Sequence, residues 1–237
     1  MVLTTAVKHA LRRIGLDIVR YMPPVGRPFP VLPLLVRERL TRNEPCVVLQ
    51  IGANDGISAD PLREVLLAHD LSGLLVEPLP EMFAALLSNY ANRPNLRFEN
   101  AAIGMHDGGT PFYRLRPGTP APRYWYDIAG FDRSLLLSHG IPAAAIETII
   151  VPTLTMTGLL AKHALPHVDL LQVDTEGHDG VIVRSALAAG LRPAIINYES
   201  CHLTCGEQVD LKRLLVEYGY RFLDIARDTL AVRPATG

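Results

Sequence analysis

The chain has 237 residues, of which 49% are hydrophobic, so it can bury the core of one large α/β domain, with or without an appendage. Its net charge of −1 gives no overall attraction to nucleic acid, which is therefore not expected as a partner. Three cysteines in a chain without an evident secretory signal favour reduced thiols and a cytoplasmic location. Cys201 and Cys205 alone are too few for a structural zinc site.

Residues 1–45 are predicted to form an N-terminal helical extension. In residues 2–21, apolar side chains recur at helical spacing beside basic ones, which is typical of a packing helix with a solvated basic face. The same pattern also suits peripheral contact with an anionic membrane surface, or a lid over an active site. No apolar stretch approaches the ~20 residues of a membrane span, so no span is expected. Nothing in the sequence indicates the oligomeric state.

A buried strand and a glycine-bracketed turn begin the main domain, predicted over residues 46–237. Residues 47–51 are aliphatic apart from Gln50, which is typical of a strand covered on both faces of a parallel sheet. The turn Gly52-Ala-Asn-Asp-Gly56 follows, and its glycines let the backbone bend sharply and a ligand approach closely. Because Asp55 would repel a pyrophosphate, the turn suits a cationic or zwitterionic ligand.

Strand and helix patterns alternate through residue 100. A helix over 60–69, with Asp60 as N-cap, precedes a strand at 74–76, a helix at 80–90 and a strand at 96–100. This order predicts parallel strands with ligands gathered at their carboxyl ends. Glu77 lies 21 positions after Gly56 (77 − 56), close to the spacing at which an acid reaches the ribose hydroxyls of a bound nucleoside.

Residues 105–148 interrupt the alternation and are predicted to be a substrate-side insertion. They contain a strand at 110–115 and the aromatic cluster Tyr124-Trp125-Tyr126. Trp125 could line a substrate pocket, or it could close a core beneath a long loop, and both interpretations stay open. Loops of this length in compact domains are usually functional or mobile.

The alternation then returns, and polar clusters follow two of its strands. Strands are predicted at 149–151, 168–173 and 194–198, helices at 157–163, 180–189 and 207–218, and a terminal antiparallel hairpin over 220–232. If the strands ending at 173 and 198 are neighbours, Asp174 and Glu199 lie side by side at the ligand edge. Such a pair could bind a divalent cation, orient a substrate hydroxyl or supply a base. Glu176 or Asp179 could instead cap the following helix.

Five segments, in this order, resemble the FkbM-type S-adenosylmethionine-dependent methyltransferases. They are Val-Val-Leu-Gln-Ile-Gly-Ala-Asn-Asp-Gly (47–56), Leu-Leu-Val-Glu-Pro (74–78), Phe-Glu-Asn-Ala-Ala-Ile-Gly (98–104), Asp-Leu-Leu-Gln-Val-Asp-Thr-Glu-Gly-His-Asp (169–179) and Ile-Asn-Tyr-Glu (196–199). The ordered set spans about residues 46–200 and is more specific than any one member. The resemblance implies a Rossmann-like class I methyltransferase sheet, mostly parallel with an antiparallel C-terminal strand, and helices on both faces.

The resemblance also implies a cofactor site for S-adenosylmethionine. Its methionine part would be surrounded by Gly52, Asn54, Asp55 and Gly56, its ribose hydroxyls held by Glu77, and its adenine bordered by Asn100 and Ala101. Two positions depart from the family pattern, since Gln50 replaces a frequent acid and Gln172 a frequent lysine. Gln50 can still accept hydrogen bonds.

The resemblance implies methylation of a hydroxyl. The molecule that carries this hydroxyl is expected to bind at the polar residues that follow the strands ending at 173 and 198. Asp174 and Glu176 match the family's Asp-x-Glu-Gly turn. We hypothesise that Asp174, with Glu199 and Glu176, orients or deprotonates the acceptor, directly or through Mg²⁺ bound by Asp174 and Glu199. His178 and His202 are alternative bases.

The implied function is an O-methyltransferase acting on a hydroxyl of a sugar, glycolipid or polyketide-like natural product, with a small-molecule or glycoside acceptor. An NAD-dependent oxidoreductase on a similar sheet is one alternative, disfavoured by the acidic loop and the missing second glycine of a dinucleotide motif. A non-catalytic cofactor-binding adaptor is another. The carboxylates at Asp174, Glu176 and Glu199 favour the enzyme over the adaptor.

Overall fold

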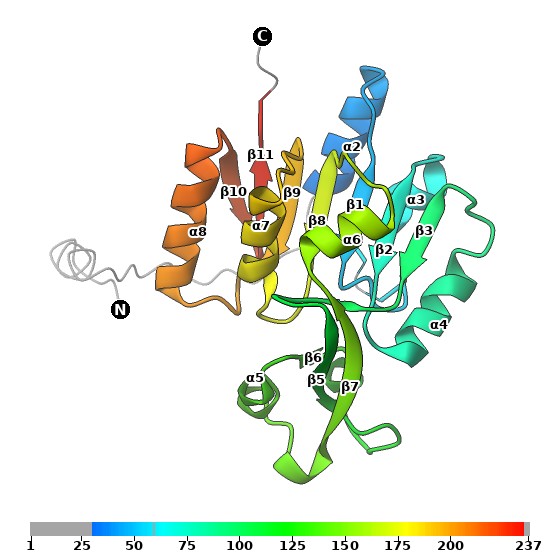
Figure 1. Cartoon of the computed structure of the whole chain (residues 1–237), viewed down its shortest axis with the longest axis vertical. Coiled ribbons are helices and arrows are strands. Elements are labelled where there is room, and N and C mark those ends of the chain that lie inside the picture. Colours follow the sequence, from blue (N-terminus) through cyan, green and yellow to red (C-terminus); the bar gives the residue numbers. More distant parts are fainter. Residues whose placement is uncertain (1–29, 59, 235–237) are drawn as a thin grey trace, which may run out of the picture. The chain divides into compact units, whose positions relative to one another are not determined.

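The computed structural model describes residues 30–58 and 60–234, so the helix predicted over 2–21 lies outside the described residues. Seven strands form the main sheet in the order β10-β11-β9-β8-β1-β2-β3 (Figure 1). Their bounds are β1 Val48–Ile51, β2 Gly73–Val76, β3 Leu96–Glu99, β8 Leu170–Val173, β9 Ile195–Glu199, β10 Arg221–Ile225 and β11 Asp228–Val232. The strands β3, β2, β1, β8 and β9 are parallel neighbours, and β11 is antiparallel to both β9 and β10. This confirms the predicted sheet, including its antiparallel C-terminal hairpin.

Helices cover both faces of the main sheet. They are α2 Val31–Thr41, α3 Arg63–Ala68 and α4 Pro80–Asn89 on one face, and α6 Met156–Lys162, α7 Asp179–Ala188 and α8 Cys205–Glu217 on the other. Successive strand residues point to opposite faces. Leu49 and Ile51 therefore join the core under α6, α7 and α8, while Val48 joins the core under α2, α3 and α4. Every residue of β1, β2 and β8 is buried, as the aliphatic runs predict.

A second, smaller sheet lies between β3 and α6 in the chain. It has the order β4-β7-β5-β6, with β4 Ala102–Ile103, β5 Gly108–Leu115, β6 Ala129–Gly130 and β7 Ile146–Leu154. Figure 1 shows it in green beyond one end of the main-sheet strands. The strand predicted at 149–151 is longer than expected, and it pairs antiparallel with β5 within this second sheet. In β7, exposed residues alternate with less exposed ones, so the apolar run visible in the sequence is shorter than the strand itself.

The helix α5, Arg133–Ser138, and the aromatic cluster pack on the second sheet. Trp125 contacts a small core formed by Leu115, Ile128, Leu136, Ile141 and Ile146. Of the two interpretations of Trp125, the structure therefore supports the core role.

The start of α3 differs from its prediction. The helix begins at Arg63 after Leu62, which makes no side-chain cap, so Asp60 is not its N-cap. Instead, the Asp60 carboxylate accepts hydrogen bonds from Leu62 N, Gln50 Nε2 and the Tyr90 hydroxyl, at 2.8, 3.1 and 3.1 Å. The carboxylate can reach Gln50 because it turns inward to the carboxyl end of β1.

The chain reverses direction across the main sheet beside β1. It runs outward from β1 through β2 to β3, passes through the second sheet, and returns to β8 on the other side of β1. Ligands of open α/β sheets bind at the carboxyl ends of the strands beside such a switch point. The loops after β1 and β8 therefore meet where a ligand is expected. Among the described residues, no helix is long and apolar enough to cross a membrane.

Candidate active site

A cavity opens at the carboxyl ends of β1, β2 and β8. Loops after these strands form part of its lining. The second sheet contributes Phe112 and Ala129, and the segments beside β6 contribute Tyr126, Asp127 and Phe131. Apolar side chains and polar groups thus share one concave site, which is typical of a small-molecule site.

Gly52 joins the two polar loops. It has φ +81°, and a Cβ built on it would lie 1.7 Å from the backbone carbonyl oxygen of Asp174. On the same side, Asp174 N donates a hydrogen bond to Ile51 O at 3.0 Å. The turn after β8 therefore packs backbone to backbone on the loop after β1, and only a glycine leaves room for this contact.

Glu77 presents a buried carboxylate at the end of β2. Its side chain lines the cavity, although the residue is only 5% exposed. Its Oε2 accepts a hydrogen bond from Asn54 N at 2.9 Å, and its Oε1 accepts one from Leu79 N at 2.8 Å. Burial raises the pKa of Glu77 to about 7, against the opposite effect of these two backbone donors. The acid predicted from spacing is thus fixed in position.

The other residues predicted to bind cofactor divide into two groups. Gly52, Asn54 and Ala101 line the cavity with Glu77, whereas Asp55, Gly56 and Asn100 do not. The Asp55 carboxylate accepts hydrogen bonds from Ile57 N and from the amide and hydroxyl of Ser58, so it folds its own loop.

Gly56 and Asn100 have structural contacts instead of a place in the cavity lining. A Cβ on Gly56 would lie 2.5 Å from the Tyr90 ring. Asn100 Nδ2 donates to the carbonyl oxygens of Glu77 and Pro78, at 2.7 and 3.1 Å. Asn100 therefore supports Glu77 through the backbone, and a direct contact with a ligand stays a prediction for these residues.

Several cavity residues were not identified from the sequence. Asp60 and Gln50 line the cavity together, and the Gln50 Oε1 atom is buried without a hydrogen-bond partner among the described residues. Asp127 accepts a hydrogen bond from Asn54 Nδ2 at 3.3 Å and so connects the segment before β6 to the loop after β1. The residue type of Asp60 indicated only a helix cap, and no local pattern in the sequence connects it with Gln50.

The predicted carboxylates of β8 and β9 do lie side by side. Asp174, Glu176 and Glu199 each offer an oxygen within 4.8 Å of the other two. Asp174 and Glu176 line the cavity, whereas Glu199, 6% exposed, lies outside its lining. Burial, reinforced by the charge of Glu199, raises the pKa of Asp174 to about 8. In its ionised form, a carboxylate with this raised pKa is a stronger base than an ordinary one and can accept a proton from a bound hydroxyl.

Asp179 has a structural role behind this cluster. It is fully buried, and its carboxylate accepts hydrogen bonds from Thr175 Oγ1, Gly177 N and Glu199 N at 3.1, 3.3 and 3.2 Å. Burial raises its pKa to about 7. These contacts hold the turn after β8 against the end of β9.

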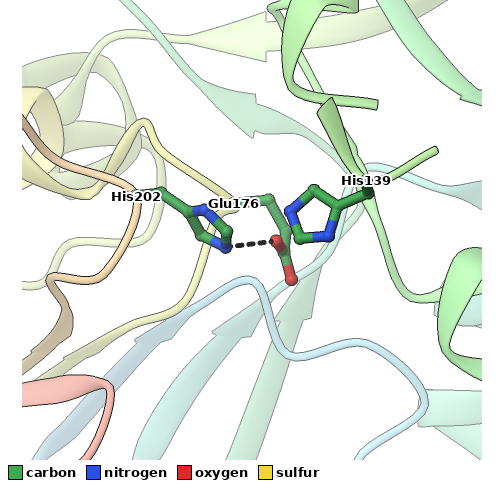
Figure 2. Close-up of side chains that lie close together, drawn as sticks. All are labelled: His139, Glu176 and His202. Atoms are coloured by element: carbon green, nitrogen blue, oxygen red, sulfur yellow. Dashed lines mark ion pairs between the residues drawn. The ribbon is translucent and has the colours of Figure 1, made fainter. Parts of the chain in front are cut away.

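Two predicted histidines occupy different environments. His178 lines the cavity with its ring centroid 4.8 Å from that of Phe131, and burial lowers its pKa, so it is neutral at pH 7. Its Nε2 is buried without a hydrogen-bond partner among the described residues. His202 Nε2 lies 3.1 Å from Glu176 Oε2 (Figure 2), and Glu176 raises the pKa of His202. The same nitrogen lies 3.4 Å from Glu199 Oε2.

The strand order, the switch point beside β1 and the buried acid after β2 define a Rossmann-like domain of the class I methyltransferase type. Within this class, a sequence match identifies the family. Residues 50–222 match the Methyltransferase FkbM domain, and the chain belongs to this family. This confirms the resemblance seen in the five ordered segments.

Solved structures of several methyltransferases are similar to this fold. An FkbM methyltransferase from Methylobacillus flagellatus KT is 12% identical, with a TM-score of 0.49, over 79% of this chain and 43% of that one. The O-methyltransferase TomG from Streptomyces achromogenes, involved in tomaymycin synthesis and solved with S-adenosylmethionine, is 14% identical, with a TM-score of 0.48, over 98% and 89%. Fibrillarin from Aeropyrum pernix, with natively bound S-adenosyl-L-methionine, is 14% identical, with a TM-score of 0.44, over 80% and 67%.

The chain thus spans less than half the length of the Methylobacillus flagellatus protein. A search among curated proteins found no match.

Proposed function

We propose that this protein transfers a methyl group from S-adenosylmethionine to a hydroxyl of a small-molecule acceptor, of the sugar, glycolipid or polyketide-like kind. Membership of the FkbM family supports the reaction class. The observation that carries the cofactor assignment is the Glu77 carboxylate, buried at the end of β2 and lining the cavity.

The residues of the cavity fit this cofactor. Each Glu77 oxygen accepts one backbone hydrogen bond and keeps a lone pair for a ribose hydroxyl. Gly52 lets a ligand approach the backbone, while Met82, Ala102 and Phe112 supply apolar walls suited to an adenine ring.

The residues of β8 supply the acceptor side of the mechanism. S-adenosylmethionine, when bound, supplies a methyl group on a sulfonium centre for in-line displacement. Asp174 and the neutral His178 line the same cavity. The ionised form of Asp174, or the His178 imidazole, can accept a hydrogen bond, and then the proton, from an acceptor hydroxyl. Glu199 lies outside the cavity lining, so its proposed role is to position Asp174 and Glu176.

The second sheet is proposed to select the acceptor. The sheet and the segments that connect its strands contribute Tyr126, Asp127, Ala129 and Phe131 to the cavity lining, which supports the predicted substrate-side role of residues 105–148. A panel of glycosides and polyketide-like polyols, monitored by mass spectrometry for one added methyl group, tests this acceptor class. Methylation of a protein or amine control in place of every polyol would contradict it.

Ligand-induced thermal stabilisation separates the proposed function from its alternatives. S-adenosylhomocysteine at about 100 times its Kd is expected to stabilise the protein by about 2.7 kcal/mol, or on the order of 5 to 10 °C in Tm. NAD is expected to leave Tm unchanged. A shift with NAD alone would favour the oxidoreductase, and cofactor binding without transfer to any acceptor would favour the adaptor.

Cofactor binding is expected to strengthen as pH rises through 7. Ribose hydroxyls donate to the ionised form of Glu77, whose pKa of about 7 leaves roughly one tenth of it ionised at pH 6 and nine tenths at pH 8. Calorimetry with S-adenosylhomocysteine should therefore give a Kd roughly tenfold lower at pH 8 than at pH 6.

Two variants test whether Glu77 causes this pH dependence. Glu77→Gln should weaken binding and remove the dependence. Glu99→Gln, at the end of the neighbouring strand β3, should retain it, because Glu99 pairs with Lys162 and His163 and does not line the cavity. An unchanged pH profile in Glu77→Gln would assign the dependence to another group.

A further inference from the structure

Negative charge gathers in excess at the ends of β8 and β9. The carboxylates there belong to Asp174, Glu176, Asp179, Glu199 and Asp228, and each of the other four raises the pKa of Asp174. Arg227 opposes them with one guanidinium, whose Nη2 lies 2.8 Å from Glu199 Oε1. Glu176 Oε2 and Glu199 Oε2 are both buried, and both face the same nitrogen, His202 Nε2, at 3.1 and 3.4 Å. One imidazole nitrogen cannot fully compensate two buried carboxylate oxygens, so a further cation would stabilise this cluster.

Two imidazoles face the same carboxylate. His139 follows α5 on the second sheet, Glu176 lies in the turn after β8, and His202 lies between β9 and α8. One ligand atom from each of the three residues lies within 4.8 Å of the other two. Figure 2 shows the three side chains pointing toward one another, and the His139 and His202 ring centroids are 5.1 Å apart. Three segments distant in sequence thus converge on one point.

We propose that His139, Glu176 and His202 form a binding site for a divalent transition-metal ion of the Zn²⁺ class. Two imidazole nitrogens and one carboxylate oxygen are the donor set of many such sites, which keep further positions open. Glu199 supplies a fourth donor, because its buried Oε2 lies 3.4 Å from His202 Nε2. The ligands of one tetrahedral zinc ion lie about 3.4 Å apart, so the three side chains need to close by roughly 1 Å.

The donor set distinguishes this site from the predicted Mg²⁺ site at Asp174 and Glu199. Mg²⁺ prefers oxygen ligands and keeps much of its water, whereas imidazole favours Zn²⁺ and its neighbours in the transition series. The proposed site does not rest on the methyl-transfer function, because the ion would bind without cofactor or acceptor. Since Glu176 also lines the cavity, an open metal position would point toward a hydroxyl or carbonyl oxygen of a bound acceptor.

Arg227 competes with a metal ion for the same ligand. Its Nη2 lies 3.0 Å from His202 Nε2, and its side chain is 59% exposed, so the guanidinium can swing into solvent when an ion binds. Arg227→Gln is therefore expected to increase metal affinity several-fold, because it removes a positive charge beside the site. A decrease in affinity would contradict the proposed position of the ion.

Metal binding by the 237-residue chain without a histidine tag tests the site directly. After chelator treatment, titration with Zn²⁺ by calorimetry, and with Co²⁺ by visible absorption, should give one equivalent bound in excess Mg²⁺. His139→Ala, His202→Ala and Glu176→Gln should each weaken binding at least on the order of 100-fold. The matched control is His163→Ala, which removes an imidazole 2.7 Å from the Glu99 carboxylate, and it should bind as the wild type does.

Two outcomes would overturn the proposal. One is a wild-type protein that takes up no Zn²⁺ or Co²⁺. The other is a His139→Ala variant that binds the metal ion as tightly as the wild type does. The ligands would then come from the carboxylates of Asp174, Glu176 and Glu199, or from the group that contains Cys201. His139 is half-buried at the end of a short helix, so its substitution should not unfold the chain, and circular dichroism checks this.

Discussion

Gly52→Ala is expected to unfold at a much lower temperature than the wild type and to lose binding of S-adenosylhomocysteine. The added Cβ would lie 1.7 Å from Asp174 O, and backbone atoms cannot move aside as a flexible side chain can. Backbone strain at φ +81° adds about 1–2 kcal/mol to this clash. We expect a total loss of more than about 4 kcal/mol, or roughly 10 °C in Tm.

Gly219→Ala provides a matched control for this prediction. Gly219 has φ +83°, but a Cβ built there would meet no atom within 4 Å. It therefore tests the backbone strain without the clash and should cost only about 1–2 kcal/mol. Calorimetric Tm values of the two variants decide the matter. Equal losses of Tm would mean that the clash between the loops after β1 and β8 adds nothing to the destabilisation.

Asp174→Asn is expected to abolish most turnover while cofactor binding survives. The substitution keeps the side-chain shape but removes a proton acceptor, so turnover with an acceptor identified from the polyol panel should fall about 10²- to 10⁴-fold. The Kd for S-adenosylhomocysteine should stay within about threefold, since Glu77 and the loop after β1 are unchanged. Tm should not fall, because a carboxyl with a pKa of about 8 is already largely protonated near pH 7, and the amide that replaces it is also uncharged.

Asp228→Asn is the control for charge alone. Asp228 belongs to the same acidic cluster and also raises the pKa of Asp174, but it does not line the cavity. We expect near wild-type turnover from it. Comparable losses of turnover in the two variants would show that turnover depends on the net charge of the cluster and not on a proton acceptor at Asp174. Full activity in Asp174→Asn would shift the role of base to His178.

The main sheet was predictable because its signals are local. Aliphatic runs such as 47–51 identify strands buried on both faces, and their alternation with helices implies a parallel order. Helix ends were less predictable. Asp60 has the residue type of an N-cap, but its carboxylate bonds with Gln50 and Tyr90, and these partners come from β1 and from the end of α4.

The candidate site was predictable where spacing along the chain carries information. Glu77 follows Gly56 at the sequence spacing expected for an acid that binds ribose hydroxyls, and the structure places it in the cavity lining. Asp55 was assigned to the cofactor by its type and loop, yet its carboxylate bonds to the amides of its own turn. A sequence shows that a carboxylate is present, but not which of several nearby donors it will meet.

The sequence by itself determined the order of strands and helices, the family and the acid at the end of β2, because each depends on neighbours within a few residues or on fixed spacing. Only the tertiary structure decided the contact of Gly52 with Asp174, the second sheet and the convergence of His139, Glu176 and His202. These features join segments that lie far apart in the chain. Their formation depends on how whole loops pack, and no local periodicity encodes that packing.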